Sequence, residues 1–209
     1  MRRITIATVV DDRPPYADEV AYLFASLELF GGETRHARRR AYFVNGVSPQ
    51  AERPLRELGV EVRVVPEVEP RYRLANKLSM FAAEAREQTD LLVALDTDIV
   101  VTGDFSAYLE RDIVQAKQPD GDGYTMEMWA ELFGRFGLAL PSERHATTLG
   151  GEWTHAYFNT GVLMVPGAVL QALHDRWLHF IRALIDARAA LPAFIALFRD
   201  TRSRSTRAP

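Results

Sequence analysis

Cysteine is absent from the 209-residue chain. This absence excludes disulfide bonds, thiolate zinc sites and cysteine nucleophiles, so neither a disulfide scaffold nor a thiol enzyme fits the sequence. A chain without cysteine is typical of a reducing compartment. We therefore expect a cytoplasmic protein.

A strong charge of one sign and long hydrophobic runs are also lacking. The net charge is −3, which gives no general attraction to nucleic acid. No apolar run is long enough to cross a bilayer, and the N-terminal "MRRITIATVVDD" turns acidic too early for a secretory signal. With 25% charged and 47% hydrophobic residues, the composition predicts a folded domain with a sizeable core.

Apolar runs and helical patterns alternate regularly through the first hundred residues. The predicted strands are residues 4–10, 41–45, 60–65 and 90–95, and the predicted helices are residues 17–30, 49–59 and 74–88. Such alternation is typical of an α/β domain with a mainly parallel sheet flanked by helices. The continuous apolar runs Ile4–Val10 and Leu91–Leu95 favour central strands that are covered on both faces.

The second half of the chain is less regular. We expect a strand at 112–117, a helix running into a loop at 125–141, a polar loop at 143–161, a buried strand at 161–165 and a long helix at 168–191. No linker separates these segments, so we expect a single domain at 1–198 followed by a basic, disordered tail at 199–209.

Two aspartates follow the last strand of the first half. In "LLVALDTDIVV", Asp96 and Asp98 end a buried run, and the apolar "IVV" after them is strand-like. Carboxylates in this position offer oxygen ligands to Mg²⁺ or Mn²⁺, which commonly join a few carboxylates to a diphosphate. Aspartate also starts turns and caps helices, so the pair alone leaves both interpretations open.

Several segments together resemble one enzyme family. "LLVALDTDIVVTGDFSAYL" resembles the metal-site segment of nucleotide-sugar-dependent glycosyltransferases with the GT-A fold, and it is most similar to the family of glycogenin and the bacterial lipopolysaccharide galactosyltransferases (glycosyltransferase family 8). "YFNTGVLMV", "NKLSMF" and "ATVVDD" resemble further segments of that family in the same order, over about residues 4 to 166.

The resemblance implies roles for individual residues. Asp96 and Asp98 would form the metal and diphosphate site, and Lys77 would contact the nucleotide or its phosphates. Thr8, Val9 and Asp11 would line the base and ribose pocket, and Asn159, Thr160 and Gly161 would border the donor sugar. From the residues alone, Lys77 is equally consistent with a solvated helix lysine, Asp11 with a turn residue, and Gly161 with a turn before a strand.

The sequence departs from the family pattern toward its C-terminus. It has no His-X-X-Gly-X-X-Lys-Pro-like segment, which would supply a third metal ligand, and no Asp-Gln pair beyond the Phe-Asn-X-Gly turn. Among the other histidines, His145 and His155 are the better candidates to reach the site, whereas His174 and His179 favour surface or interface positions. The chain also ends early for the family. A shortened relative, a truncated product and a diverged subgroup are the alternatives.

The resemblance implies a metal-dependent glycosyltransferase that uses a nucleotide-diphosphate sugar, with a UDP-sugar as the first candidate. It also implies Mn²⁺ or Mg²⁺ as the metal and an unknown glycan, protein or lipid as the acceptor. A non-catalytic GT-A domain that binds nucleotide is the alternative. A sugar nucleotidyltransferase fits less well, because "TVVDDRPPYADE" lacks a glycine-rich phosphate loop. Trp177, Phe180 and Leu184, with nearby arginines, suit a weak membrane-surface contact, although a core-facing helix explains them better.

Overall fold

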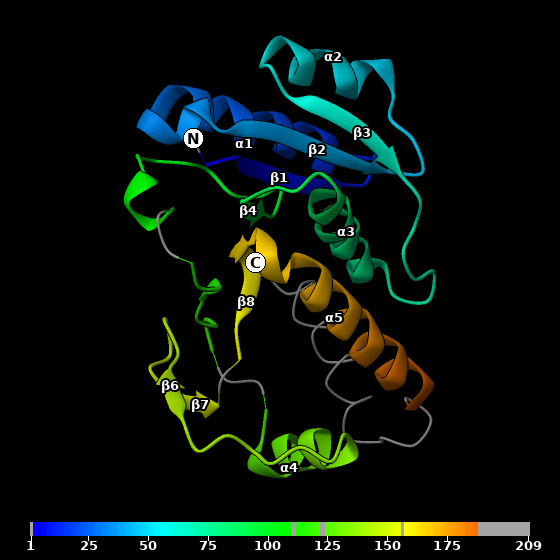
Figure 1. The fold of residues 1–209 in the computed structure, drawn as a ribbon, viewed down its shortest axis with the longest axis vertical. Helices are drawn as coiled ribbons and strands as arrows, with labels where there is room; N and C mark the ends of the chain where they lie inside the picture. Colours follow the sequence, from blue (N-terminus) through cyan, green and yellow to red (C-terminus); the bar gives the residue numbers. More distant parts are fainter. Residues whose placement is uncertain (1, 110–111, 122–123, 156, 188–209) are drawn as a thin grey trace, which may run out of the picture. The chain divides into compact units, whose positions relative to one another are not determined.

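The computed structural model describes residues 2–109, 112–121, 124–155 and 157–187 (Figure 1). They form two compact units. Of these described residues, the first unit contains those up to Lys117 together with Thr160–His179, and the second contains those of Gln118–Asn159 and of Phe180–Ala187. The predicted domain at 1–198 and the predicted tail at 199–209 stay predictions, because residues 188–209 lie outside the described part.

A six-stranded sheet organises the first unit, with the strand order β3-β2-β1-β4-β8-β5. β1, β2, β3 and β4 run parallel, and β8 is antiparallel to β4. The bounds are β1 Ile4–Val10, β2 Arg38–Val44, β3 Glu61–Val65, β4 Leu91–Leu95, β5 Gln115–Lys117 and β8 Asn159–Pro166. The mainly parallel sheet and the central positions of β1 and β4 are confirmed.

Burial explains why β1 and β4 are central. All five residues of β4 are buried, as its uninterrupted apolar run predicts. Helix α1 (Tyr16–Phe30) places Leu23, Phe24 and Leu27 in one core cluster with Ile6 of β1 and Val93 of β4. The apolar stripe of α1 and the strands therefore share one hydrophobic core.

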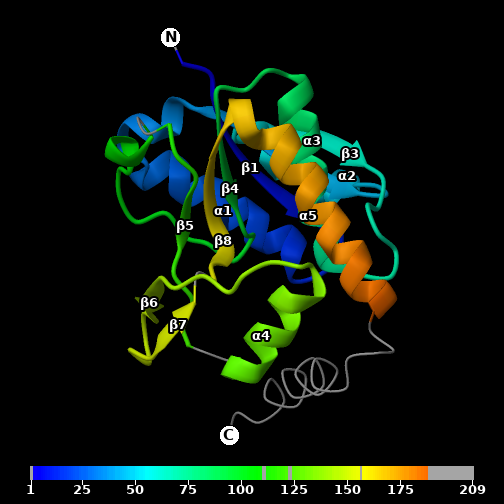
Figure 2. The same cartoon turned by 60° about the horizontal axis from the view of Figure 1, so that its bottom comes forward.

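Helix α3 (Leu78–Arg86) and helix α5 (Gly167–Ala187) lie side by side (Figure 2). The ring of Phe81 in α3 meets the ring of Trp177 in α5 edge-on, with centroids 5.8 Å apart. Phe180 packs against Phe136 in the same way at 4.7 Å. These contacts favour the core-facing interpretation of α5 over a membrane-surface patch. No helix in the described ranges is long and apolar enough to cross a membrane.

The second unit contains helix α4 (Met126–Arg135) and a two-stranded hairpin of β6 (Arg144–Ala146) and β7 (Trp153–His155). The helix predicted within 125–141 corresponds to α4. A loop is predicted at 143–161, where the structure has the hairpin, so the loop prediction is wrong there. The two strands have three residues each and carry polar and aromatic side chains. They therefore show neither the length nor the alternation that identifies a strand in sequence.

Two further expectations are corrected. Ile99–Val101 forms no strand; the backbone N–H of Val101 instead donates to Ser26 Oγ of α1 at 3.0 Å. Lys77 does not lie within an α-helix, because Arg73–Lys77 forms a separate 3₁₀ helix, η2, that precedes α3. The remaining described helices are α2 (Pro49–Glu57), η1 (Gly32–His36) and η3 (Ser106–Tyr108).

Candidate active site

Two aspartates lie at the C-terminal edge of the sheet. Asp11 follows β1 and Asp96 follows β4, and these strands are parallel neighbours in which Ala7 is paired with Ala94. Parallel neighbours end at the same edge, where α/β proteins commonly bind ligands. The acidic ends of β1 and β4 therefore lie at one edge of the sheet.

The 3₁₀ helix η2 connects these strand ends through basic side chains. Arg73 Nη2 lies 2.6 Å from Asp11 Oδ2, and Lys77 Nζ lies 2.5 Å from Asp96 Oδ1. The two basic residues are the first and last of η2. One short element thus supplies a cation to each acidic strand end.

Lys77 contacts two of the other predicted site residues, Asp96 and Thr160. Its ammonium group donates to the carbonyl oxygen of Thr160 at 2.7 Å and contacts Thr160 Oγ1 at 3.1 Å, in addition to its ion pair with Asp96. The backbone N–H of Asp96 donates to the carbonyl oxygen of Gly161 at 2.9 Å. Lys77, Asp96, Thr160 and Gly161 therefore come together around the ends of β4 and β8.

Asp98 differs from Asp96. It is exposed and has neither a hydrogen bond nor an ion pair with the part of the chain that the structure describes. Between the two aspartates, Thr97 Oγ1 donates to Glu19 Oε2 of α1 at 2.7 Å and so anchors the turn. Asp98 is thus left as a carboxylate with free oxygens beside a fixed turn.

Asp96 and Asp98 suit a metal site that substrate phosphates and water complete. Among the described residues, no group of three or more histidine, cysteine, aspartate or glutamate side chains is placed to hold a metal. A closed, all-protein cage therefore does not fit. Mg²⁺, however, is commonly held by one or two carboxylates together with substrate phosphates and water. Asp98, with Asp96 once its pairing to Lys77 is exchanged, fits that arrangement.

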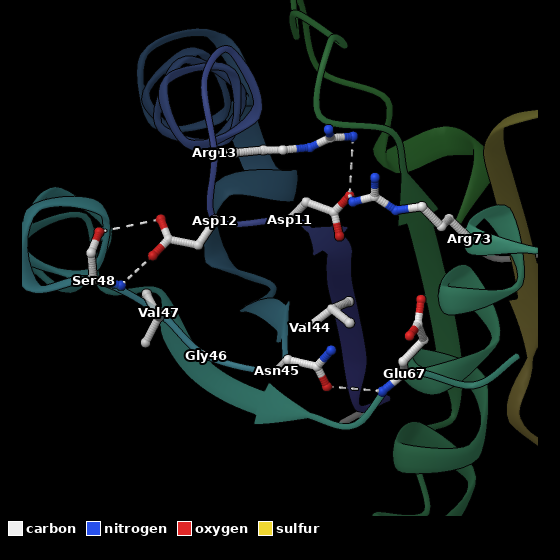
Figure 3. Close-up of a pocket in the computed structure, with 10 residues that line it drawn as sticks. All are labelled: Asp11, Asp12, Arg13, Val44, Asn45, Gly46, Val47, Ser48, Glu67 and Arg73. Atoms are coloured by element: carbon white, nitrogen blue, oxygen red, sulfur yellow. Dashed lines mark hydrogen bonds and ion pairs between the residues drawn. The ribbon is translucent and has the colours of Figure 1, made fainter. Parts of the chain in front are cut away.

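A hollow of about 490 Å³ lies at the ends of β1, β2 and β3 (Figure 3). Asp12 accepts hydrogen bonds from the backbone N–H and the hydroxyl of Ser48, and Asn45 Oδ1 accepts one from the Glu67 N–H at 3.3 Å. The hollow falls in the size range of small-molecule sites. Its lining residues are Asp11, Asp12, Arg13, Val44, Asn45, Gly46, Val47, Ser48, Glu67 and Arg73.

Several of these residues were missed in the sequence. Arg73 stands three positions before the "NKLSMF" segment that was associated with the nucleotide, and this proximity is its only signal in the sequence. Asn45 carries a different signal: it is the last residue of the predicted strand at 41–45, and its φ is +63°, a left-handed conformation that asparagine tolerates better than most residues. Sequence gives no comparable signal for Ser48 or Glu67.

The other predicted residues lie elsewhere. Thr8 is fully buried inside the sheet, and its hydroxyl has no hydrogen-bond partner within the described ranges. Val9 is partly buried, and neither residue lines the hollow. Asn159 begins β8 and belongs to the second unit. Of the base and ribose residues predicted from the resemblance, only Asp11 borders the hollow.

The two candidate histidines both lie in the second unit. His155 is buried, and neither ring nitrogen has a hydrogen-bond partner among the described residues. Its ring lies 6.0 Å from that of Trp129, and the ring of His145 lies 6.2 Å from that of Phe158. Both rings therefore pack against aromatic side chains of their own unit.

Comparison with known proteins supports one enzyme class. The sequence model described as the Rhodobacterales glycosyltransferase domain matches residues 7–200. No curated protein matches the chain significantly. Among solved structures, an active-site mutant of LgtC has a TM-score of 0.55 at 17% identity and covers 78% of this chain and 57% of its own.

Two other structures share the fold. WbbM, a bifunctional glycosyltransferase, has a TM-score of 0.53 at 16% identity, over 87% of this chain and 35% of its own. Mouse xyloside xylosyltransferase 1 has a TM-score of 0.51 at 12% identity, over 87% of this chain and 74% of its own. The architecture is thus the GT-A fold. The chain spans a little over half the length of LgtC.

Proposed function

Because the chain belongs to the family of Rhodobacterales glycosyltransferase domains, we propose that it transfers a sugar from a nucleotide-diphosphate sugar, with a UDP-sugar as the first candidate, to a glycan, protein or lipid acceptor, and that it requires Mn²⁺ or Mg²⁺. One observation carries the proposal. The Lys77–Asp96 pair lies at the same edge of the sheet as the 490 Å³ hollow. Charged groups suited to a diphosphate are therefore found beside space suited to a nucleoside.

Each group has a role in this proposal. The hollow receives the base and ribose, with Asp11 at its border and Thr8 and Val9 in the strand beneath. Asp96 and Asp98 would hold the metal, which when bound would neutralise charge on the diphosphate leaving group. Lys77 turns from Asp96 toward the phosphate oxygens, and Asn159, Thr160 and Gly161 border the donor sugar.

The exchange of partners at Lys77 follows from charge. With no donor bound, Asp96 and Lys77 satisfy each other at 2.5 Å. A diphosphate presents oxyanions that Lys77 would contact, and Asp96 would then hold the metal in place of the ammonium group. Both charges remain paired throughout, so binding leaves no isolated charge in the partly buried site.

Calorimetric titration of UDP and GDP, with Mn²⁺ or with EDTA, tests the metal requirement. We expect tight binding only with Mn²⁺, because the acidic strand end otherwise repels the diphosphate. Asp98→Asn should reduce affinity in Mn²⁺ to the EDTA level without changing the thermal midpoint, since Asp98 is exposed and unpaired within the described ranges. Asp18→Asn, at an exposed position on α1, is the matched control. Equal affinity in EDTA and Mn²⁺ would refute the proposal.

Turnover is measured as UDP release from a panel of UDP-sugars with Mn²⁺, with and without candidate acceptor saccharides. Asp96→Ala provides the blank. Release that disappears in this variant supports an enzyme whose chemistry depends on Asp96. Donor binding without release, across the whole panel, would instead favour a domain that binds nucleotide only.

A further inference from the structure

The polar groups at the C-terminal edge of the sheet follow the strand order β3-β2-β1-β4. Asp96 follows β4 and Asp11 follows β1, whereas Asn45 follows β2. Glu67 lies two positions beyond the end of β3, three strand spacings or about 14 Å from β4. A nucleotide that lies along this edge, with its diphosphate at Asp96 and its ribose at Asp11, therefore has its base at Asn45 and Glu67.

Asn45 has a fixed orientation in the hollow (Figure 3). Its backbone N–H donates to the carbonyl oxygen of Val65 at 2.8 Å, and its Oδ1 accepts from the backbone N–H of Glu67 at 3.3 Å. Because the N–H of Glu67 can only donate, the oxygen of the Asn45 amide must face it. The two N–H donors of Asn45 Nδ2 are left over, and they have no partner among the described residues.

Glu67 is half-buried and lines the same hollow. Its carboxylate has neither a hydrogen bond nor an ion pair with the part of the chain that the structure describes. The other carboxylates that line the hollow are already engaged. Asp11 pairs with Arg73 at 2.6 Å, and both oxygens of Asp12 accept from Ser48. Glu67 is therefore the lining carboxylate that is left for a ligand.

We propose, on the basis of the proposed function, that Glu67 and Asn45 select a base that carries a ring N–H beside a carbonyl group. Uracil has this arrangement at N3–H and C4=O, and guanine has it at N1–H and C6=O. The Glu67 carboxylate accepts from the ring N–H, and Asn45 Nδ2 donates to the carbonyl oxygen. Each of the two groups that the protein leaves unpaired thereby gains a partner.

Cytosine and adenine present the reverse arrangement. Each has a ring nitrogen without a proton, beside an amino group. The Glu67 carboxylate would then face a nitrogen lone pair, and the Asn45 amide would face N–H donors instead of an acceptor. A site built to hydrogen-bond one ligand strongly rejects an analogue that leaves its polar groups unpaired. UDP and GDP therefore carry the accepted edge, whereas CDP and ADP do not.

Calorimetric titration of the full chain with UDP, GDP, CDP and ADP in Mn²⁺ tests the proposal. We expect UDP, GDP or both to bind more tightly than CDP and ADP, and the comparison of UDP with GDP identifies the base. Glu67→Gln combined with Asn45→Asp exchanges donors for acceptors and keeps the total charge of the two side chains. This double variant should bind UDP about tenfold less tightly than the parent and CDP about tenfold more tightly. A misfolded protein could not show the gain for CDP.

Glu57→Gln is the matched control, because it makes the same change at an exposed position near the end of α2, outside the hollow. We expect this control to keep the parent's order of affinities, and circular dichroism checks that every variant is folded. A parent that binds CDP as tightly as UDP and GDP, or a double variant that keeps the parent's order, would overturn the roles of Glu67 and Asn45 and leave the proposed function standing. Binding of none of the four diphosphates would overturn both.

Discussion

At the scale of single residues, Lys77 is the side chain whose loss should most affect chemistry and least affect folding. Lys77→Met removes the cation that would stabilise the leaving diphosphate, so we expect UDP release at saturating donor to fall by about 100-fold. Asp96 stays 42% exposed and can be hydrated, so the thermal midpoint should change little. Lys77→Arg, which keeps the charge, should recover part of the rate. An unchanged rate in Lys77→Met would exclude this role.

The site could be predicted only in part at this scale. Asp96 and Lys77 carry signals in their local sequence, namely a buried strand before the aspartate and, for the lysine, the "NKLSMF" segment that resembles the family. Arg73 pairs with Asp11 across 62 positions of the chain, and its local sequence says nothing of that partner. Contacts of this kind depend on strand order, which the sequence of either residue does not contain.

At the scale of elements, a buried ionic network fastens α3 to the sheet. Glu84 of α3 is fully buried and accepts hydrogen bonds from Arg40 at 2.8 Å, from Tyr42 at 2.6 Å and from Thr89. Burial and the bond to Glu84 raise the pKa of the Tyr42 hydroxyl, which therefore stays protonated as a donor. η2 leads directly into α3, so this network also steadies the element that carries Lys77.

Removing one partner from the network should be costly. We expect Glu84→Gln to lower the free energy of unfolding by about 3 kcal/mol, because the charge on buried Arg40 loses its most buried partner. Urea titration measures this loss. Arg40→Met combined with Glu84→Leu should cost less than Glu84→Gln, since it leaves no uncompensated charge. Glu57→Gln, at an exposed position, should have almost no effect. A Glu84→Gln protein as stable as the parent would contradict the account.

The same network predicts acid sensitivity. Hydrogen bonds from Arg63 and Arg40 lower the pKa of Glu87 from 4.5 to about 2. A lowered pKa in the folded state stabilises the protein above pH 4.5, and this contribution is lost as the pH falls toward about 2. Urea midpoints measured across that range should therefore fall with pH, and Glu87→Gln should flatten this part of the dependence. If the urea midpoints of the parent and the variant fell equally with pH, other carboxylates would dominate the pH dependence of stability.

Prediction from sequence worked best for elements that bury an uninterrupted apolar surface. β1 and β4 are recognisable because every residue of the run is apolar or β-branched, and α1 because its apolar residues recur at helical spacing. Ile99–Val101 shows the limit of the same reasoning. Its residues favour a strand, but Val101 hydrogen-bonds to Ser26 of α1 instead of pairing with the sheet.

At the scale of the whole molecule, the two units share the chain in an interleaved way. The chain passes from the first unit into the second after β5 and returns to the first within β8. β5 and β8 are neighbours in one sheet. Because both ends of the inserted segment are held by adjacent strands, we expect the units to unfold together, as a single domain would.

Trp177→Phe allows a direct measurement. Trp177 lies in the first unit, whereas Trp129 and Trp153 lie in the second, so the remaining fluorescence reports the second unit alone. Far-UV circular dichroism reports helices of both units. Coincident urea midpoints from the two signals indicate one cooperative domain, and an earlier fluorescence transition would show that the second unit opens independently.

The geometry of η2 restricts insertions and deletions within this element. A 3₁₀ helix turns by about 120° per residue, so adding or deleting one residue between Arg73 and Lys77 would rotate one side chain a third of a turn away from its aspartate. Both ends of the element are bound to strand ends by ion pairs, so a change of length within it would break one of these pairs. Insertions among homologues should therefore be rare within these five positions. They should be common in surface turns such as residues 137–139, which are exposed and follow the end of α4.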